Sequence, residues 1–258
     1  MFPTLGPLPT HDVFVGLGVL AAVAVFVAEA RRRDQTDERI AYVVLGALVG
    51  GAVFMRLGTW LQHLDLRQNA SLTEQWLYGN RSILGGLFGA WLGVHVAKRL
   101  VGYRPRTGDL FAPAVALGMA IGRIGCYLTE APGRPTGLPW GVHAPSTTPH
   151  CPGCLTGQAM HPSFIYEIVF QLTAFAALLW LRNRITKPGE LFIIYVASYA
   201  VFRFFVEFTR ANETVWLNLT RPQWFLLPSL VVIGLRLRHG YRRGYYDDLL
   251  APREVAPA

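Results

Sequence analysis

The sequence predicts an all-α, polytopic membrane protein. Three observations support this fold class. The chain has 258 residues, of which 52% are hydrophobic and only 16% charged, against roughly 25% charged in an average soluble domain. Its mean hydropathy is +0.31. Seven apolar runs approach the length that a helix needs to cross about 30 Å of hydrocarbon, and they cover 12–30, 39–58, 82–99, 109–128, 163–182, 189–208 and 222–238. Alternating strand patterns are not evident, which favours a helical bundle over a β-barrel.

The first four runs differ in the charges that bound them. The first has no basic segment before it and is followed by Arg31, Arg32 and Arg33, which fits an uncleaved first helix with its N-terminus outside. The second ends in "AVFMRLG", which carries Arg56. The third begins in "SILGGLFGA". The fourth contains the uncharged stretch "LFAPAVALGMAI" and is closed by Arg123.

The last three runs include the most charged helix. The fifth run starts within "HPSFIYE". The sixth ends in "YAVFRFFVEFTR", whose Arg203, Glu207 and Arg210 are spaced four and three residues apart. That spacing places the three side chains on one helix face. The seventh run is followed by a basic and then mixed tail.

The distribution of basic residues predicts the orientation. Most of the 24 lysines and arginines lie in the first, third and fifth connections and in the tail, which are therefore predicted to be cytoplasmic. Residues 1–238 are predicted to form a single seven-helix membrane domain. Its outward loops 59–81, 129–162 and 209–221 would form a small periplasmic head or cap, and 239–258 a cytoplasmic tail. The net charge of +8 does not indicate nucleic-acid binding, because the basic residues lie between apolar runs and not on one face.

Several charged residues fall at the predicted outward ends of the runs, namely Arg56, Arg123, Arg203, Arg210, Glu130, Glu167 and Glu207. Arginine inside a membrane helix is costly and usually faces a polar cavity or a partner. The alternative is that each arginine snorkels to the interface. A shared polar cavity is favoured because several arginines and glutamates recur in the same leaflet. Planar guanidinium groups bind phosphate bidentately, so the predicted ligand is an anionic lipid head group.

The motifs of this chain, and their order, resemble those of the prolipoprotein diacylglyceryl transferase family. "SILGGLFGA" resembles its Gly-Gly-Leu helix start, and "GRIGCYLTEAPGRPT" its Gly-Arg signature with a later Glu and Gly-Arg. "HPSFIYE", "KPGELFIIYVASYAVFRFFVEFTR" and "LTRPQWFLLP" resemble three further motifs of the family. The five motifs occur in order over nearly the whole chain.

The resemblance implies a specific reaction. A diacylglyceryl group would pass from phosphatidylglycerol to the thiol of the lipobox cysteine of a preprolipoprotein, and glycerol-1-phosphate would leave. The reaction would occur at the periplasmic side of the bacterial inner membrane and use no cofactor. Two alternatives stay open. One is a paralogue that uses another acceptor or another anionic phospholipid, and the other is a non-enzymatic lipid-binding or transport protein.

The resemblance also implies roles for single residues. Arg123 and Arg203 match the essential arginines, and Glu130 matches the signature glutamate if one residue is deleted before it; these three are the predicted catalytic residues. The predicted substrate-binding residues are Arg56, Gly85, Gly86, Gly122, His161, Tyr166, Glu167, Glu207 and Arg210. The chain departs from the family at two positions. Leu84 replaces a histidine that is a proposed base, and Cys126 replaces an asparagine.

The predicted outward loop "VHAPSTTPHCPGCLTGQAMH" contains a Cys-x-x-Cys pair. Cys151, Cys154 and His150 could hold a structural zinc ion. A disulfide or a plain rigid turn is favoured instead, since the loop is predicted to lie in an oxidising compartment. Redox catalysis would need a thioredoxin-like βαβ context, which the sequence lacks. Cys126 is interpreted as a small apolar packing residue.

Overall fold

A computed structural model describes residues 4–62, 82–143, 157–185 and 187–249. The chain divides into two compact units. Unit 1 consists of Met1–Arg33 and Arg106–Ala258, and unit 2 of Asp34–Pro105. Each unit is described by itself.

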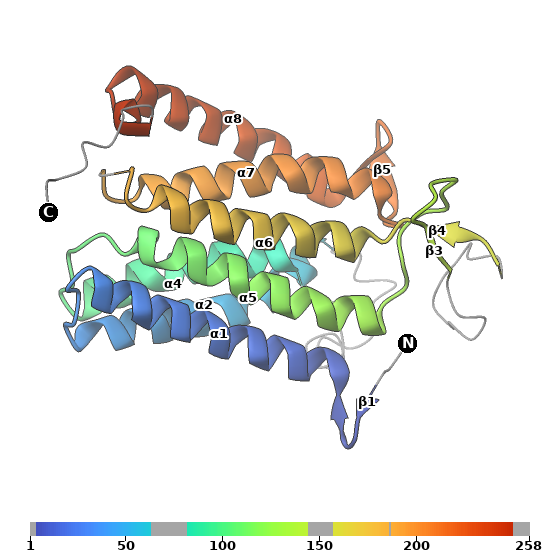
Figure 1. Ribbon diagram of the computed structural model, residues 1–258, viewed down its shortest axis with the longest axis horizontal. Coiled ribbons are helices and arrows are strands. Elements are labelled where there is room, and N and C mark those ends of the chain that lie inside the picture. The colour runs from blue at the N-terminus through green and yellow to red at the C-terminus, as the bar shows by residue number, and fades with distance from the viewer. Residues whose placement is uncertain (1–3, 63–81, 144–156, 186, 250–258) are drawn as a thin grey trace, which may run out of the picture. The chain divides into compact units, whose positions relative to one another are not determined.

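Unit 1 is a bundle of five helices: α1 (Thr10–Arg32), α5 (Gly108–Thr129), α6 (Ser163–Leu181), α7 (Glu190–Val206) and α8 (Arg221–Arg242). Within it, α5 packs against α1, α6 and α7, and α7 packs against α8 (Figure 1). Short 3₁₀ turns follow α7 and α8, at Glu207–Thr209 and Asp247–Leu249. Unit 2 contains α2 (Arg39–Gln62) and α4 (Ile83–Leu100).

Among the described residues, three two-stranded antiparallel pairings accompany the helices, all in unit 1. They pair β1 (Thr4–Leu5) with β2 (Leu8–Pro9), β3 (Val142–His143) with β4 (Ala159–Met160), and β5 (Thr214–Trp216) with β6 (Leu219–Thr220). The fold is therefore mostly helical and not strictly all-α. Strands of two or three residues are too short to leave an alternating pattern in the sequence.

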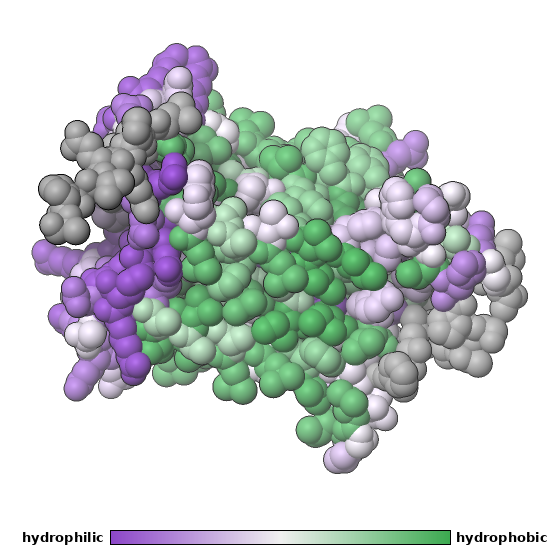
Figure 2. Space-filling view, in the orientation of Figure 1, coloured by the Kyte–Doolittle hydropathy of each residue, from purple (hydrophilic) through white to green (hydrophobic). Residues whose placement is uncertain are grey.

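Within the residues that the structure describes, five helical segments are long and apolar enough to cross a membrane, so the protein is polytopic. They are Thr10–Arg32, Arg39–Gly58, Gly108–Thr129, Ser163–Leu181 and Glu190–Thr209. The described residues hold seven α-helices in all, and each lies over one of the seven predicted runs. In Figure 2 apolar side chains cover the middle of α6 and α7, and hydrophilic side chains gather where α8 ends.

The apolar core of unit 1 lies between α5, α6 and α7. It contains Ala112 and Ala116 of α5, Leu178 of α6, and Leu191 and Tyr195 of α7. The alanines are small, which lets the backbones of the neighbouring helices approach α5 closely. This packing fixes the relative positions of the helix ends on which the polar site is built.

Buried carboxylates hold the end of unit 1 at which α7 begins. Asp109 accepts hydrogen bonds from the backbone N–H of Gly189 at 2.8 Å and of Phe192 at 3.3 Å, which caps the N-terminus of α7. Two further buried carboxylates pair with arginines at this end: Glu29 with Arg32 and Arg182, and Glu190 with Arg236. Burial of the Tyr246 phenol, helped by its hydrogen bond to Glu190, raises the pKa of Tyr246.

In unit 2, glycines bring α2 and α4 together. A Cβ atom at Gly46 would lie 2.6 Å from the carbonyl oxygen of Gly93, so a larger residue would force the helices apart. A Cβ atom at Gly85 would lie 2.5 Å from the carbonyl oxygen of Phe54. Gly85 was predicted to bind substrate, and the structure gives this glycine a packing role within unit 2.

Candidate functional site

Five charged side chains from three helix ends meet in unit 1. We call Arg123, Glu167, Arg203, Glu207 and Arg210 the arginine–glutamate cluster. Arg123 lies near the end of α5, Glu167 in the second turn of α6, and the other three at the end of α7 and just beyond it. Arg123 is 5% and Arg203 7% exposed, and both glutamates are fully buried. Charges this deeply buried are retained only when they are paired or bind a ligand.

One carboxylate of the cluster bridges two guanidinium groups. Nε of Arg123 lies 2.5 Å from Oε2 of Glu167, and Nη1 of Arg210 donates to Oε1 of the same carboxylate at 3.0 Å. The ring of Phe164 contacts both cations, with its centroid 5.8 Å from Cζ of Arg123 and 4.8 Å from Cζ of Arg210. Glu167 and Phe164 therefore hold two positive charges near each other.

The second carboxylate, Glu207, is held by polar groups on α7, on the segment before β5 and on β6. It forms an ion pair with Arg203, one helical turn earlier. Its Oε1 accepts hydrogen bonds from Nδ2 of Asn212 at 2.7 Å and from Oγ1 of Thr220 at 2.9 Å. Nε of Arg210 lies 3.9 Å from its Oε2, which is too long for a hydrogen bond. Glu207 thus fixes Arg203 and ties the end of α7 to the β5–β6 hairpin.

The cluster carries an excess of positive charge, since three arginines face two glutamates. Burial lowers the pKa of Arg210, and the neighbouring Arg203 and Arg123 lower it further, against the opposite effect of Glu167. Nη2 of Arg123 and Nε of Arg210 are buried without a hydrogen-bond partner among the described residues. Unpartnered buried donors beside unbalanced positive charge are features typical of an anion-binding site.

The segment that follows α5 packs tightly onto the cluster. The backbone N–H of Gly133 donates to the carbonyl of His161 at 2.8 Å, and that of Arg134 donates to the carbonyl of Thr209 at 2.8 Å. Nε of Arg134 also donates to the carbonyl of Arg210 at 2.9 Å. These bonds join the chain after α5 to the start of α6 and to the end of α7.

We expect Gly133→Ala to destabilise the protein by about 1–3 kcal/mol, because its Cβ atom would overlap the carbonyl oxygen of Thr209 and Oγ of Ser163. The midpoint of thermal unfolding in detergent measures this cost. Gly137→Ala is the matched control, since a Cβ atom at Gly137 would meet nothing within 4 Å. Equal midpoints for the two variants would contradict the packing described here.

Other predicted residues lie beside the cluster. The hydroxyl of Tyr166 accepts a hydrogen bond from Nε1 of Trp140 at 2.9 Å and lies 3.3 Å from Nδ1 of His161. A Cβ atom at Gly122 would meet nothing within 4 Å, so the space at this position is open. Arg56, Gly85 and Gly86 belong to unit 2. Cys151, Cys154 and His150 lie outside the described residues.

The structure places Glu130 differently from the other predicted residues. Its side chain is exposed and forms no ion pair with an arginine of the described chain. Its carboxylate lies instead near the thiol of Cys126 and the ring of His11. Glu130, a predicted catalytic residue, is therefore placed beside Cys126 and His11 rather than in an ion pair with the cluster.

Sequence reasoning missed four residues near the predicted ones: Tyr199, Asn212, Thr220 and His11. Tyr199 is buried and interacts electrostatically with Arg123 and Arg203. Its position four residues before Arg203 was a usable signal, since the two share a helix face. Asn212 and Thr220 lie in or beside a hairpin, and His11 meets α5 through a long-range contact, so no local pattern indicates them.

Comparison with known proteins identifies the family of the chain. The family model for prolipoprotein diacylglyceryl transferase matches residues 4–237. A phosphatidylglycerol–prolipoprotein diacylglyceryl transferase of Thermosynechococcus vestitus is 34% identical, over 93% of this chain and 92% of its own. Those of Cupriavidus metallidurans and Geobacillus kaustophilus are each 30% identical, over 93% and 96% of this chain and 92% and 96% of their own. The chain belongs to the prolipoprotein diacylglyceryl transferase family.

Proposed function

We propose that the arginine–glutamate cluster binds the phosphate of phosphatidylglycerol while the diacylglyceryl group of the lipid moves to a preprolipoprotein cysteine. The transfer itself, and residence in the bacterial inner membrane, follow from membership of the family. The observation that carries the site assignment is the unbalanced positive charge of the cluster. A phosphate anion would neutralise that charge and accept hydrogen bonds from the unpartnered guanidinium donors.

The transfer reaction explains why the arginines are the most important residues of the cluster for catalysis. The thiolate sulfur of the acceptor attacks the glycerol carbon that bears the phosphate ester. The S–C bond forms, the C–O bond breaks, and its electron pair leaves on the oxygen of glycerol-1-phosphate. Arg123 and Arg203 hold the phosphate and stabilise the charge that grows on this oxygen, as preorganised donors do in other enzymes. Glu167 and Glu207 position the guanidinium groups.

Several finer assignments belong to this proposal. The N-terminus lies on the periplasmic side of the membrane and the tail after Arg238 in the cytoplasm, so that the cluster lies in the periplasmic leaflet. His161 and Tyr166 lie around the lipid. Arg56, Gly85 and Gly86 of unit 2 remain predicted substrate-binding residues. Gly122 leaves room for the head group beside Arg123.

A direct assay tests the proposal. Purified protein in nanodiscs is incubated with phosphatidylglycerol and a lipobox peptide, and mass spectrometry follows the peptide. We expect a peptide heavier by one diacylglyceryl group, and no change when serine replaces the lipobox cysteine or phosphatidylethanolamine replaces phosphatidylglycerol. Loss of phosphatidylglycerol without a modified peptide would overturn the proposed acceptor. Bound lipid without turnover would overturn the assignment as an enzyme.

A further inference from the structure

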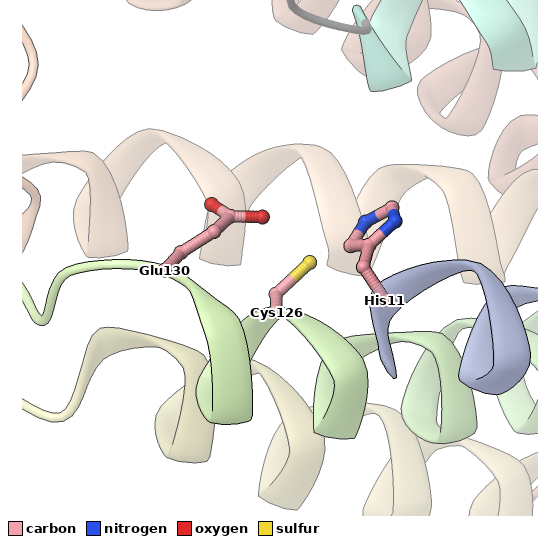
Figure 3. Close-up of side chains that lie close together, drawn as sticks. All are labelled: His11, Cys126 and Glu130. Atoms are coloured by element: carbon pink, nitrogen blue, oxygen red, sulfur yellow. The ribbon is translucent and has the colours of Figure 1, made fainter. Parts of the chain in front are cut away.

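An imidazole, a thiol and a carboxylate converge where α1 begins and α5 ends. A ring nitrogen of His11, the sulfur of Cys126 and a carboxylate oxygen of Glu130 all lie within 4.8 Å of one another. Figure 3 shows the sulfur of Cys126 between the carboxylate and the imidazole, with His11 carried by α1 and the other two by the end of α5. We call these residues the His–Cys–Glu group.

The sequence builds this convergence through helix spacing and one glycine. Cys126 and Glu130 are four residues apart at the end of α5, so their side chains share one face. Gly125 lets the start of α1 approach this end of α5, because a Cβ atom there would lie 3.2 Å from Cα of His11 and 2.9 Å from Cβ of Phe14. A side chain at residue 125 would push His11 away from α5.

The His–Cys–Glu group adjoins the arginine–glutamate cluster. Nη1 of Arg123 donates to Sγ of Cys126 at 3.6 Å, so one buried thiol separates the imidazole from a guanidinium that we assign to the phosphate. The side chain of His11 is 30% exposed, which leaves it open to a substrate. A Cβ atom at Gly122, one helical turn before Cys126, would meet nothing within 4 Å among the described residues. The face of α5 that carries the group is therefore open at that turn.

We propose that His11 is the general base that takes the proton from the acceptor thiol, a role that rests on the proposed function. Leu84 stands where the resemblance to the family places a histidine that is a proposed base. The structure brings a different histidine, from the start of α1, to the edge of the cluster. Histidine is the most common general base in enzymes. Glu130 is less suited to take the proton of a thiol, because a carboxylate is a weaker base than an imidazole.

The charges around the imidazole suit this role. Nδ1 of His11 lies 3.3 Å from Oδ1 of Asp12. Since a carboxylate only accepts, this contact keeps a proton on Nδ1 and leaves the lone pair of Nε2 to take another. The carboxylates of Asp12 and Glu130 stabilise the imidazolium that forms. The strands β1 and β2, which also pack against α1, carry no charged residue.

The proton and the electron pairs balance over the reaction. The thiol proton moves to Nε2 of His11, and the sulfur keeps the electron pair of the S–H bond. The S–C bond forms at the glycerol carbon, and the C–O bond breaks with its electron pair on the oxygen of glycerol-1-phosphate. The imidazolium then releases its proton to water, which regenerates the neutral base. Cys126 remains a thiol throughout and forms no bond to the substrate.

The pH dependence of transfer tests this base. At pH 7 about 3% of a cysteine thiol with a pKa near 8.5 is already thiolate, so complete ionisation would raise the rate about 30-fold. We expect His11→Gln to lower transfer to a lipobox peptide by about 10- to 30-fold at pH 7. The deficit should fall below about threefold at about pH 9.5, where the acceptor ionises without help. A deficit that is the same at both pH values would overturn the proposal.

A selenocysteine lipobox peptide separates the base from a structural role. A selenol is ionised at neutral pH and needs no base, so the unaltered protein and His11→Gln should modify this peptide at similar rates. Loss of folded protein lowers the rates with both peptides equally, whereas loss of the base lowers only the rate with cysteine. Equal deficits of His11→Gln with the two peptides would therefore contradict the assignment even if the variant is less stable.

His95→Gln is the matched control, since His95 is an exposed residue of α4 whose ring bonds to the carbonyl of Trp91. We expect this variant to modify both peptides like the unaltered protein. If His11→Gln also modifies the cysteine peptide at the unaltered rate at pH 7, His11 is not the base, although the proposed function stands. No transfer from phosphatidylglycerol to either peptide by the unaltered protein would overturn the proposed function and the role of His11 with it, so the two failures are distinguishable.

Discussion

Arg123→Lys is expected to lower transfer of the diacylglyceryl group by at least about 100-fold, the loss typical of removing one preorganised donor to a developing oxyanion. Lysine keeps the positive charge but is a single ammonium point charge, whereas the guanidinium is a planar fork. Nε of Arg123 faces Glu167 and Nη1 faces Cys126, while Nη2 has no hydrogen-bond partner among the described residues. An ammonium group has three donors, but it lacks the fixed planar fork that lets the guanidinium face Glu167 and a phosphate from separate nitrogens.

Arg236→Lys is the control for this experiment. Arg236 also pairs with a buried carboxylate, that of Glu190, but at the end of unit 1 at which α7 begins. Its replacement should leave the transfer rate close to that of the unaltered protein. The rate is measured with phosphatidylglycerol and lipobox peptide for each variant after its unfolding midpoint is recorded. A rate for folded Arg123→Lys within about threefold of the unaltered protein would contradict phosphate stabilisation by the Arg123 fork.

The helices could be predicted closely because their apolar length is fixed by the membrane. The run 109–128 corresponds to α5 at Gly108–Thr129, and the run 12–30 to α1 at Thr10–Arg32. The residues at which the helices begin and end are set by capping hydrogen bonds, which the hydropathy of the sequence does not predict. At the start of α8, Thr220 and Gln223 form a capping box, so the helix begins at Arg221.

The site could be predicted only where its residues are close in sequence. The spacing of Arg203, Glu207 and Arg210 placed them on one helix face, and the structure brings them together. The partnership of Glu167 with Arg123 and Arg210 joins residues 43 and 44 positions apart, and no local pattern encodes such pairs. The same limit explains Glu130, which the motif placed with the arginines and which the structure places beside Cys126 and His11.

Basic residues at the other end of unit 1 illustrate a related limit. From the sequence, Arg32, Arg182 and Arg236 contribute only to the charge bias that predicts which loops are cytoplasmic. In the structure they pair with the buried carboxylates of Glu29 and Glu190. Counting charges predicts which side a loop occupies, but it does not show which of the charges also hold helices together.

Glu207→Ala is expected to destabilise the protein by about 3–5 kcal/mol, the cost of removing one partner from a buried ion pair. Glu207 is fully buried and is the partner of Arg203 in an ion pair. It is also the acceptor for Asn212 and Thr220. Without it, the cluster keeps three arginines and one glutamate, so that the buried positive charge increases and Arg203 loses its only ion-pair partner among the described residues.

Glu213→Ala is the matched control, because Glu213 is an exposed glutamate six residues away for which we expect a change within about 0.5 kcal/mol. Thermal unfolding in detergent compares the two variants, with and without added phosphate or phosphatidylglycerol. Since an anion would neutralise the additional positive charge, ligand should raise the midpoint of Glu207→Ala more than that of Glu213→Ala. Equal ligand shifts would show that the anion binds elsewhere, whereas equal midpoints without ligand would show that Glu207 does not stabilise the buried arginines.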